Sequence, residues 1–262
     1  MTKPPATRPD LTDAIARVLD EQRAFEEHRA TRLGRGAEAI TAPLGSVVRQ
    51  VVPPSAMRQA LDAADRVAAA TLPDMTHDTR DLPACDAAAL RAQAWAMGAN
   101  AASGAGAGWF GGAGMAVDIP ATMTLAARNV RATGMAYGFA ANTDDERMFR
   151  LTVLELATTS ATEARAGAIS RINQMARGIG GTVAKEGLDW VVDKAVERIA
   201  RQLGTDLAQR KAAQIIPIAG AVLGAGINAS FQTDVSRAAR YAYRQRWLNA
   251  QGLLPAPKDE AG

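Results

Sequence analysis

Two long stretches without a charged residue constrain the fold of this chain more than any other feature. Residues 92–117 include 10 alanines and 7 glycines among 26 residues, and residues 212–233 form a second uncharged stretch of 22. Alanine has the highest helix propensity and a small side chain, so both stretches favour helices that pack at short range. Aromatic residues make up only 5% of the chain, fewer than a sheet would need. We therefore expect an all-α fold, a compact multi-helix bundle with tightly packed Gly/Ala-rich central helices.

The length of the first stretch alone would admit a membrane-spanning helix. Its strongly apolar members are few, however, and alanine and glycine contribute little free energy of transfer into a bilayer. Each glycine also weakens a free helix by roughly 0.5–1 kcal/mol relative to alanine. Glycine is typical of places where two helix backbones approach closely. The composition therefore favours a pair of buried helices, joined by a Gly-rich turn near residues 103–114, over insertion into a membrane.

Capping residues and the spacing of apolar residues predict the other helices. Helices are expected to start near Asp10, Ser55, Asp118 and Asp144, and a final helix follows residue 233. Residues 182–203 form the clearest amphipathic pattern, and residues 72–86, with prolines at 73 and 83, form the longest interior loop. Residues 1–9 and 255–262 are expected to be disordered tails on either side of a single domain, 10–254.

The charges and the cysteine content limit the classes of partner and compartment. Lys+Arg 30 against Asp+Glu 27 leaves a net charge of only +3, and a nucleic-acid binder should show a basic stripe with interleaved aromatics. The one basic stretch, residues 237–246, is interpreted as the solvated side of a terminal helix, so no nucleic-acid partner is expected. The single cysteine, Cys85, excludes an internal disulfide and fits a reducing, cytoplasmic compartment. No signal peptide is predicted at the Pro-rich N-terminus.

Two glycine-bearing segments together resemble a known family. The first is Gly111–Pro120, which continues through Leu125, Arg128 and Arg131 to Tyr137–Phe139, and an acidic helix start at residues 144–147 follows it. The second is Ile216–Asn228, with the spacing Pro-x-x-Gly-x-x-x-Gly-x-x-x-Asn, followed by a helix with Ala238, Tyr241 and Arg246. In this order, the two segments are similar to the EcsC family.

The resemblance implies a helical domain but no defined chemistry. The family is named for a protein encoded beside an ABC exporter, and its own biochemical role is generally given as unknown. That neighbourhood implies a membrane-linked task, so the resemblance leads us to expect a cytoplasmic protein that is peripheral to a membrane or bound to a membrane protein.

Four polar residues in these two segments are the candidates for ligand binding: Asp118, Arg128, Arg131 and Asn228. Asp118 is most simply a helix cap. Arg128 and Arg131 are three residues apart on one helix and can face one phosphate or carboxylate, although pairing with acids of a neighbouring helix, such as residues 144–146, is the simpler interpretation. Asn228 follows a glycine face and is expected to be a buried polar residue that fixes packing or bonds to the backbone.

No catalytic residue is identified from the sequence, and neither a metal nor a cofactor is expected. His28 and His77 are far apart, and no cluster of histidine, cysteine and carboxylate ligands is visible. Three hypotheses follow. The first is a non-enzymatic protein accessory to a membrane or transporter-linked process, the second is a helical bundle that binds an anionic lipid or small ligand, and the third is a hydrolase whose site is assembled from distant helices.

Overall fold

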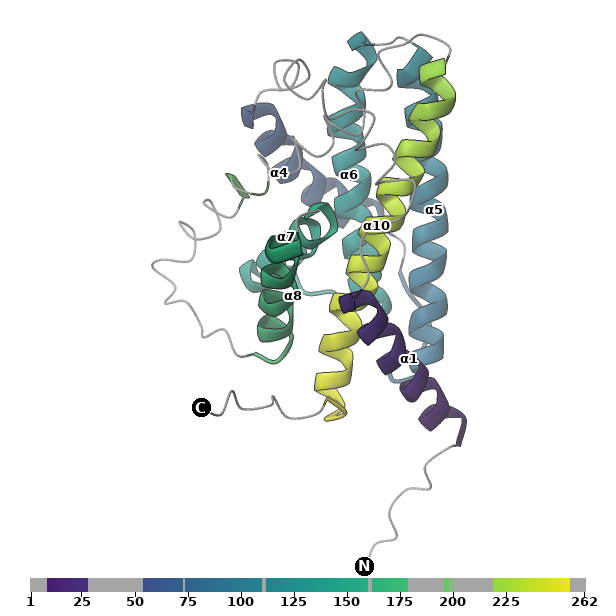
Figure 1. Ribbon diagram of the computed structural model, residues 1–262, viewed down its shortest axis with the longest axis vertical. Helices are drawn as coiled ribbons and strands as arrows, with labels where there is room; N and C mark the ends of the chain where they lie inside the picture. The colour runs from purple at the N-terminus through teal and green to yellow at the C-terminus, as the bar shows by residue number, and fades with distance from the viewer. Residues whose placement is uncertain are drawn as a thin grey trace, which may run out of the picture.

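The fold is all-α over the part of the chain that the structure describes. This computed structural model describes residues 9–27, 54–72, 74–109, 112–159, 162–178, 196–197, 199 and 219–254. Within these ranges seven helices pack together and no strand is present (Figure 1). The helices are α1 (Pro9–Glu27), α4 (Pro54–Thr71), α5 (Leu82–Trp109), α6 (Gly112–Ala136), α7 (Asp144–Thr158), α8 (Thr162–Ala176) and α10 (Ala219–Ala250).

Helix α10 is the centre of the bundle. It runs beside α5 over much of its length and also packs against α6, α7 and α8 (Figure 1). Helices α10 and α5 run antiparallel, since Asn228 bonds to Asn100 and Arg244 bonds to Asp86. The largest side chains of the core lie on it, with Phe231, Tyr241 and Tyr243 all 1% exposed or less. The second half of α10 is therefore buried on most of its sides.

Helix α6 crosses α10 at a glycine. A Cβ atom at Gly134 would lie 2.7 Å from Cζ of Tyr243, so only glycine allows the two helices to approach this closely. The helix ends two residues later, at Ala136, in a Schellman motif in which the Phe139 amide donates to the Gly134 carbonyl at 2.8 Å and Gly138 adopts a φ of 87°. Both glycines therefore shape the end of α6.

Several predictions from periodicity are confirmed. Helices α4 and α7 start at Pro54 and Asp144, as their capping residues indicate, and Thr143 accepts the amide of Glu146 as an N-cap. The predicted apolar stripe of α6 is buried, while residues 124, 128 and 131 on the other stripe are partly exposed. The buried members of that stripe are Ile119, Met123, Ala126, Val130 and Tyr137.

The prediction that Asp118 caps a helix is wrong. Helix α6 already starts at Gly112, so Asp118 lies inside it and is 1% exposed. Pro120 is also internal to the helix, and its missing amide hydrogen leaves the carbonyl of residue 116 without its usual partner. The combination of aspartate and proline is the same one that starts many helices, which is why the local pattern misleads.

Three other boundaries differ from the prediction. Helix α5 starts at Leu82, so the loop predicted over 72–86 ends at residue 81 and Pro83 occupies the first turn of the helix. Helix α5 then continues to Trp109 and α6 begins at Gly112, so most of the segment predicted to be a Gly-rich turn, residues 103–114, is helical. Helix α8 was not predicted, because residues 162–176 carry only a weak apolar periodicity.

Some predictions fall on residues outside the described ranges. The amphipathic helix expected over 182–203 is described only at residues 196, 197 and 199, where Val196 and Ile199 are buried. The two tails also lie outside. The side chains of the Gly-rich segment 104–117 are not among those described, so close Gly/Ala packing there stays a prediction. None of the helices in the described part of the chain combines the length and apolar character that crossing a membrane requires.

Candidate functional site

Asp118 and Asn228, two of the four predicted site residues, lie in one buried polar cluster. The Asn228 amide nitrogen donates to both carboxylate oxygens of Asp118, at 3.2 and 3.3 Å, and Ser103 Oγ donates to Asp118 Oδ1 at 2.7 Å. Asn228 and Asn100 also exchange side chain to backbone hydrogen bonds at 2.9 and 3.1 Å. The cluster therefore ties α5, α6 and α10 together at one level.

This cluster is closed to solvent. Asn100 and Asn228 are 0% exposed and Asp118 is 1% exposed. The amide oxygens of Asn100 and Asn228 are buried without a hydrogen-bond partner among the described atoms. The hydrogen bonds of the cluster join three helices, so it fixes their packing, as expected for Asn228.

Arg128 lies in a different environment, at the wall of an open cavity. Its Nε and Nη2 donate to the side chain and carbonyl oxygens of Thr71, at 3.1 and 3.0 Å, and its guanidinium stacks on the Trp95 ring with Cζ 3.7 Å from the ring centroid. The cavity has a volume of about 450 Å³, within the range of ligand pockets. Its lining comes from the loop after α4, from α5 and from α6: Leu72, Asp74, Met75, Thr76, His77, Ala88, Arg91, Ala92, Trp95, Arg128 and Ala132.

Arg131 is not part of this cavity lining. Its Nη1 lies 3.4 Å from Oδ1 of Asn142, in the loop before α7. The structure thus brings Asp118 together with Asn228 and places Arg128 on the cavity, with Arg131 directed to another loop. One of the acids proposed as partners, Glu146, forms an ion pair with Arg246 at 2.6 Å.

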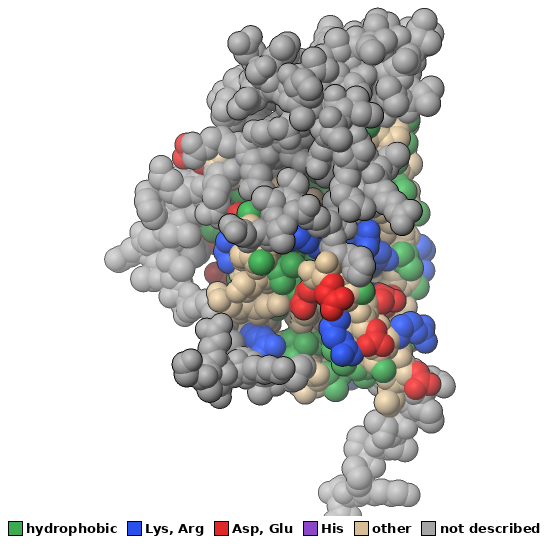
Figure 2. Space-filling view, viewed as in Figure 1, with side chains coloured by type: hydrophobic (Ala, Val, Ile, Leu, Met, Phe, Trp, Pro, Cys, Tyr) green, Lys and Arg blue, Asp and Glu red, His purple; other side chains and the backbone are tan. Residues whose placement is uncertain are grey.

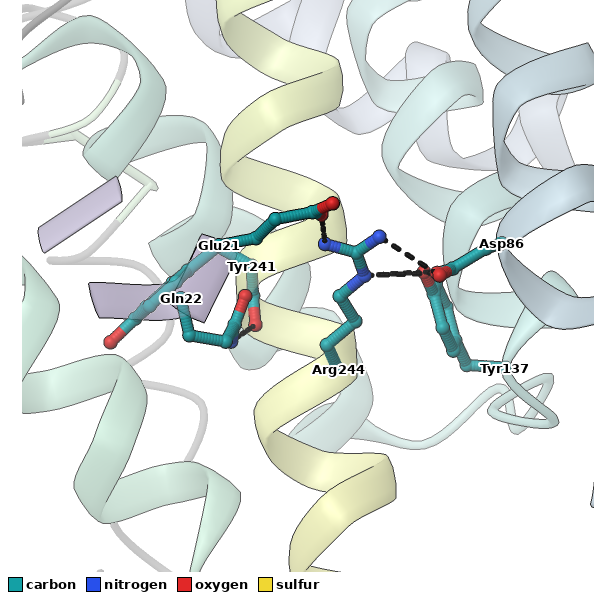
Figure 3. Close-up of polar contacts among 6 residues, drawn as sticks. All are labelled: Glu21, Gln22, Asp86, Tyr137, Tyr241 and Arg244. Carbon is teal, nitrogen blue, oxygen red and sulfur yellow. Dashed lines mark hydrogen bonds and ion pairs between the residues drawn. The ribbon is translucent and has the colours of Figure 1, made fainter. Parts of the chain in front are cut away.

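A third group of polar residues, unpredicted as a group, joins α1, α5 and α10 (Figure 3). Arg244 donates to both carboxylate oxygens of Asp86 at 2.9 Å and to Glu21 at 2.6 Å, and the Tyr137 hydroxyl donates to Asp86. Gln22 bonds to the Tyr241 carbonyl at 2.9 Å. Figure 3 shows the guanidinium of Arg244 lying between the two carboxylates. The polar atoms of this group bond to one another, so it holds α1 on the bundle.

The interpretation of residues 237–246 as a solvated basic face is wrong. Arg244 is 8% exposed and ion-paired, while Arg246 stacks on Phe139 and Phe149 with Cζ 4.2 and 4.5 Å from the ring centroids. Burial lowers the pKa of Arg240, and the neighbouring Arg244 lowers it further. The reason is that α10 is central, so its arginines meet acids from α1, α5 and α7.

The described residues offer little for catalysis or metal binding. Burial, reinforced by Asp86, raises the pKa of the Cys85 thiol to about 12, so this cysteine is a poor nucleophile near neutral pH. No group of three histidine, cysteine or carboxylate side chains converges in the described ranges. The residues that the sequence missed as site candidates are Arg91, Trp95 and His77. The spacing of Arg91 and Trp95, four apart on one helix face, was the available signal.

Of the comparisons with known proteins, the one with family models finds a match. Neither a curated protein nor a solved structure matches the chain. The model of the EcsC protein family matches residues 16–248, which is 233 of the 262 residues. The chain therefore belongs to the EcsC protein family.

Proposed function

We propose that this chain is a non-enzymatic accessory protein that binds peripherally to an anionic membrane surface through the outer face of α5. The outer face of α5 is defined as the exposed residues between positions 87 and 102. They are Ala87, Leu90, Arg91, Ala94, Trp95, Gly98 and Ala102.

The observation that supports this proposal is the composition of that face. Leu90 and Trp95 are each 49% exposed, and Arg91 is the one charged residue on the face. The face spans about 22 Å at 1.5 Å per residue and lies on a helix at the edge of the bundle (Figure 1). By contrast, side chains of both charges are interspersed over α1 and the C-terminal part of α10 (Figure 2). Trp and Leu beside Arg are typical of helices that lie in a membrane interface.

The expected affinity is low. Full burial of a large apolar side chain contributes about 1.5–3 kcal/mol, so the half-exposed Leu90 and Trp95 contribute about 1 kcal/mol each. An arginine near an anionic surface contributes about 1 kcal/mol, and Arg91 and Arg128 both lie at this side. A total of about 4 kcal/mol corresponds to a dissociation constant of about 1 mM. Binding should therefore be reversible, and it should weaken with salt.

Vesicle flotation tests this proposal. The protein should float with vesicles of phosphatidylglycerol at low salt and should stay in solution with vesicles of phosphatidylcholine. Leu90→Glu should reduce flotation by about fivefold or more, because it removes about 1 kcal/mol of burial and adds a repelled charge. Leu253→Glu is the matched control, since Leu253 is 38% exposed but follows α10. Equal flotation of the two variants, or flotation that high salt leaves unchanged, would refute the proposed face.

The hydrolase hypothesis has less support. Tyr137, Asp86 and Arg244 do converge, but they bond to one another. Burial holds the pKa of the Tyr137 hydroxyl well above its usual range, so the phenol stays protonated and is a weak base. A membrane protein partner, such as a transporter, is tested by crosslinking from a cysteine placed at Ala94 in a Cys85→Ser background. A defined adduct in membranes, with none in pure lipid vesicles, would indicate that this face binds a membrane protein and not the lipid surface.

A further inference from the structure

We propose that the cavity beside Arg128 is a binding site for an anionic amphiphile, a molecule that joins a phosphate, sulfonate or carboxylate to a flat or extended apolar body. This inference goes beyond surface binding, because it concerns a single molecule held within the fold. It rests on the cavity, whose lining shares Arg91 and Trp95 with the outer face of α5 but does not include Leu90.

The walls of the cavity combine an apolar floor with a polar rim. Ala88 and Ala132 are 4% and 2% exposed, and Leu72, Met75 and Ala92 are partly buried. Asp74, Thr76, Arg91 and Trp95 are exposed at the rim. A volume of about 450 Å³ suits a small organic molecule better than a bare ion. The apolar part of a ligand would lie on the floor, with its charged group at the rim.

Arg128 is already held in place for an anion. Two of its five N–H groups bond to Thr71, whose carbonyl lies at the exposed C-terminus of α4. Three N–H groups remain for a ligand, and stacking on Trp95 fixes the plane of the guanidinium. A side chain that is ordered before binding loses little conformational entropy when the ligand arrives.

The charges at the cavity favour an anion. Arg91 and Arg128 form no ion pair within the described residues, and the lining contains a single carboxylate, Asp74, against these two arginines. Burial lowers the pKa of Arg128, so a neighbouring anion would relieve the cost of desolvating this cation. The Nε2 of His77 donates a hydrogen bond to the Ala136 carbonyl at 2.7 Å. In its neutral form His77 therefore accepts at Nδ1, which suits a ligand hydroxyl.

Paired fluorescent probes test the charge requirement. We expect 1-anilinonaphthalene-8-sulfonate to bind at one molecule per chain and more tightly than N-phenyl-1-naphthylamine, which has the same rings without the sulfonate. Because Arg128→Gln removes a charge-assisted hydrogen bond to the sulfonate, it should raise the dissociation constant of the sulfonate probe by about tenfold or more. The same change should alter the dissociation constant of the neutral probe by no more than about twofold. Arg17→Gln, an exposed arginine on α1 that does not line the cavity, is the matched control.

Two further variants separate binding from stability. Arg128 also bonds to the end of α4, so its loss can lower the melting temperature. Arg91 makes no bond to the end of α4. Arg91→Gln should therefore raise the dissociation constant of the sulfonate probe severalfold without changing the melting temperature. Trp95→Ala should weaken the binding of both probes, because it removes a side chain that lines the cavity. The proposal is overturned if Arg91→Gln and Arg17→Gln bind the sulfonate equally, or if the neutral probe binds as tightly as the sulfonate.

A competition experiment identifies the source of the anion. Displacement of the bound sulfonate by phosphatidylglycerol vesicles, and not by phosphatidylcholine vesicles, assigns the site to a lipid head group. Displacement by soluble dodecyl phosphate alone assigns it to a soluble amphiphile. Equal displacement by both kinds of vesicle contradicts an anion site. Leu90→Glu should leave probe binding unchanged, because Leu90 does not line the cavity. Failure of the membrane proposal and failure of this one are therefore distinguishable.

Discussion

All three tyrosines of the chain are buried, and raising the pH should therefore unfold the protein through their ionisation. Tyr137, Tyr241 and Tyr243 are each 2% exposed or less. Burial is the largest cause that raises the pKa of each phenol above its usual value near 10. Neighbouring carboxylates add to this effect, because Glu26 and Glu146 accept the hydroxyl protons of Tyr241 and Tyr243.

The sign of the effect follows from the protons bound in each state. Above pH 10 the unfolded chain releases phenol protons that the folded chain keeps, so the free energy of unfolding falls as the pH rises. Each phenol contributes about 1.4 kcal/mol per pH unit, and three contribute about 4 kcal/mol. The Cys85 thiol, with its pKa raised from 9.0 to about 12, adds a similar slope from pH 9 upward.

The magnitudes place the transition. Between pH 9 and 11 the thiol contributes about 3 kcal/mol and the phenols about 4 kcal/mol, and their sum of about 7 kcal/mol lies within the 5–15 kcal/mol stability of a typical domain. We therefore expect full stability below pH 9 and cooperative unfolding at about pH 11–12.

Tyrosinate absorbance at 295 nm and circular dichroism at 222 nm, recorded together, measure this transition. Both signals should change at the same pH, because the phenols ionise only when the helices unfold. Tyr241→Phe should make the dependence of stability on pH shallower by about 1.4 kcal/mol per unit. Tyrosinate absorbance that rises with a midpoint near pH 10, while the helical signal stays constant, would refute the burial argument.

Four substitutions test other parts of the fold by urea unfolding. Gly134→Ala should destabilise the protein by about 1–2 kcal/mol, because overpacking against Tyr243 outweighs the gain of about 1 kcal/mol in helix propensity. Gly98→Ala, with nothing within 4 Å of the new Cβ, should instead stabilise it by about 0.5–1 kcal/mol, and the same sign for both would contradict the packing. Asn228→Ala should lower the free energy of unfolding by about 2–3 kcal/mol, because it removes the amide that donates to both oxygens of the buried Asp118 carboxylate; a loss below about 0.5 kcal/mol would contradict this role. Asp86→Asn should cost about 2–4 kcal/mol, because it leaves Arg244 buried beside a neutral amide, and Arg244→Met in the same chain should recover part of that loss.

The sequence predicted what depends on near neighbours along the chain. The burial of one stripe of α6 follows from apolar residues at helical spacing, and the start of α7 follows from Thr143 and the acids after it. The all-α class follows from composition. These features need no knowledge of which helix packs against which.

The wrong predictions concern residues whose surroundings are set by side chains far away in the sequence. The arginines of α10 looked solvated, because their partners Glu21, Asp86 and Glu146 lie 223, 158 and 100 positions away. Asp118 resembled a cap, because a cap and a buried carboxylate inside a helix have the same local pattern near proline. Trp95 was missed for a similar reason, since its role depends on Arg128 from another helix.

The two family-like segments meet at the Asp118–Asn228 contact, and this separates packing from binding in the molecule. Hydrogen bonds between α5, α6 and α10 align these helices, because a shift of α10 by one turn would break the bonds of Asn228 with Asn100 and with Asp118. Arg128 lies ten residues further along α6, about 15 Å away at 1.5 Å per residue, in a cavity that these bonds do not reach. Substitutions at the Asp118 cluster should therefore change stability and leave probe binding intact once folded. Arg91→Gln should do the reverse, and a variant of the cluster that folds normally yet loses the probe would show that the two regions are coupled.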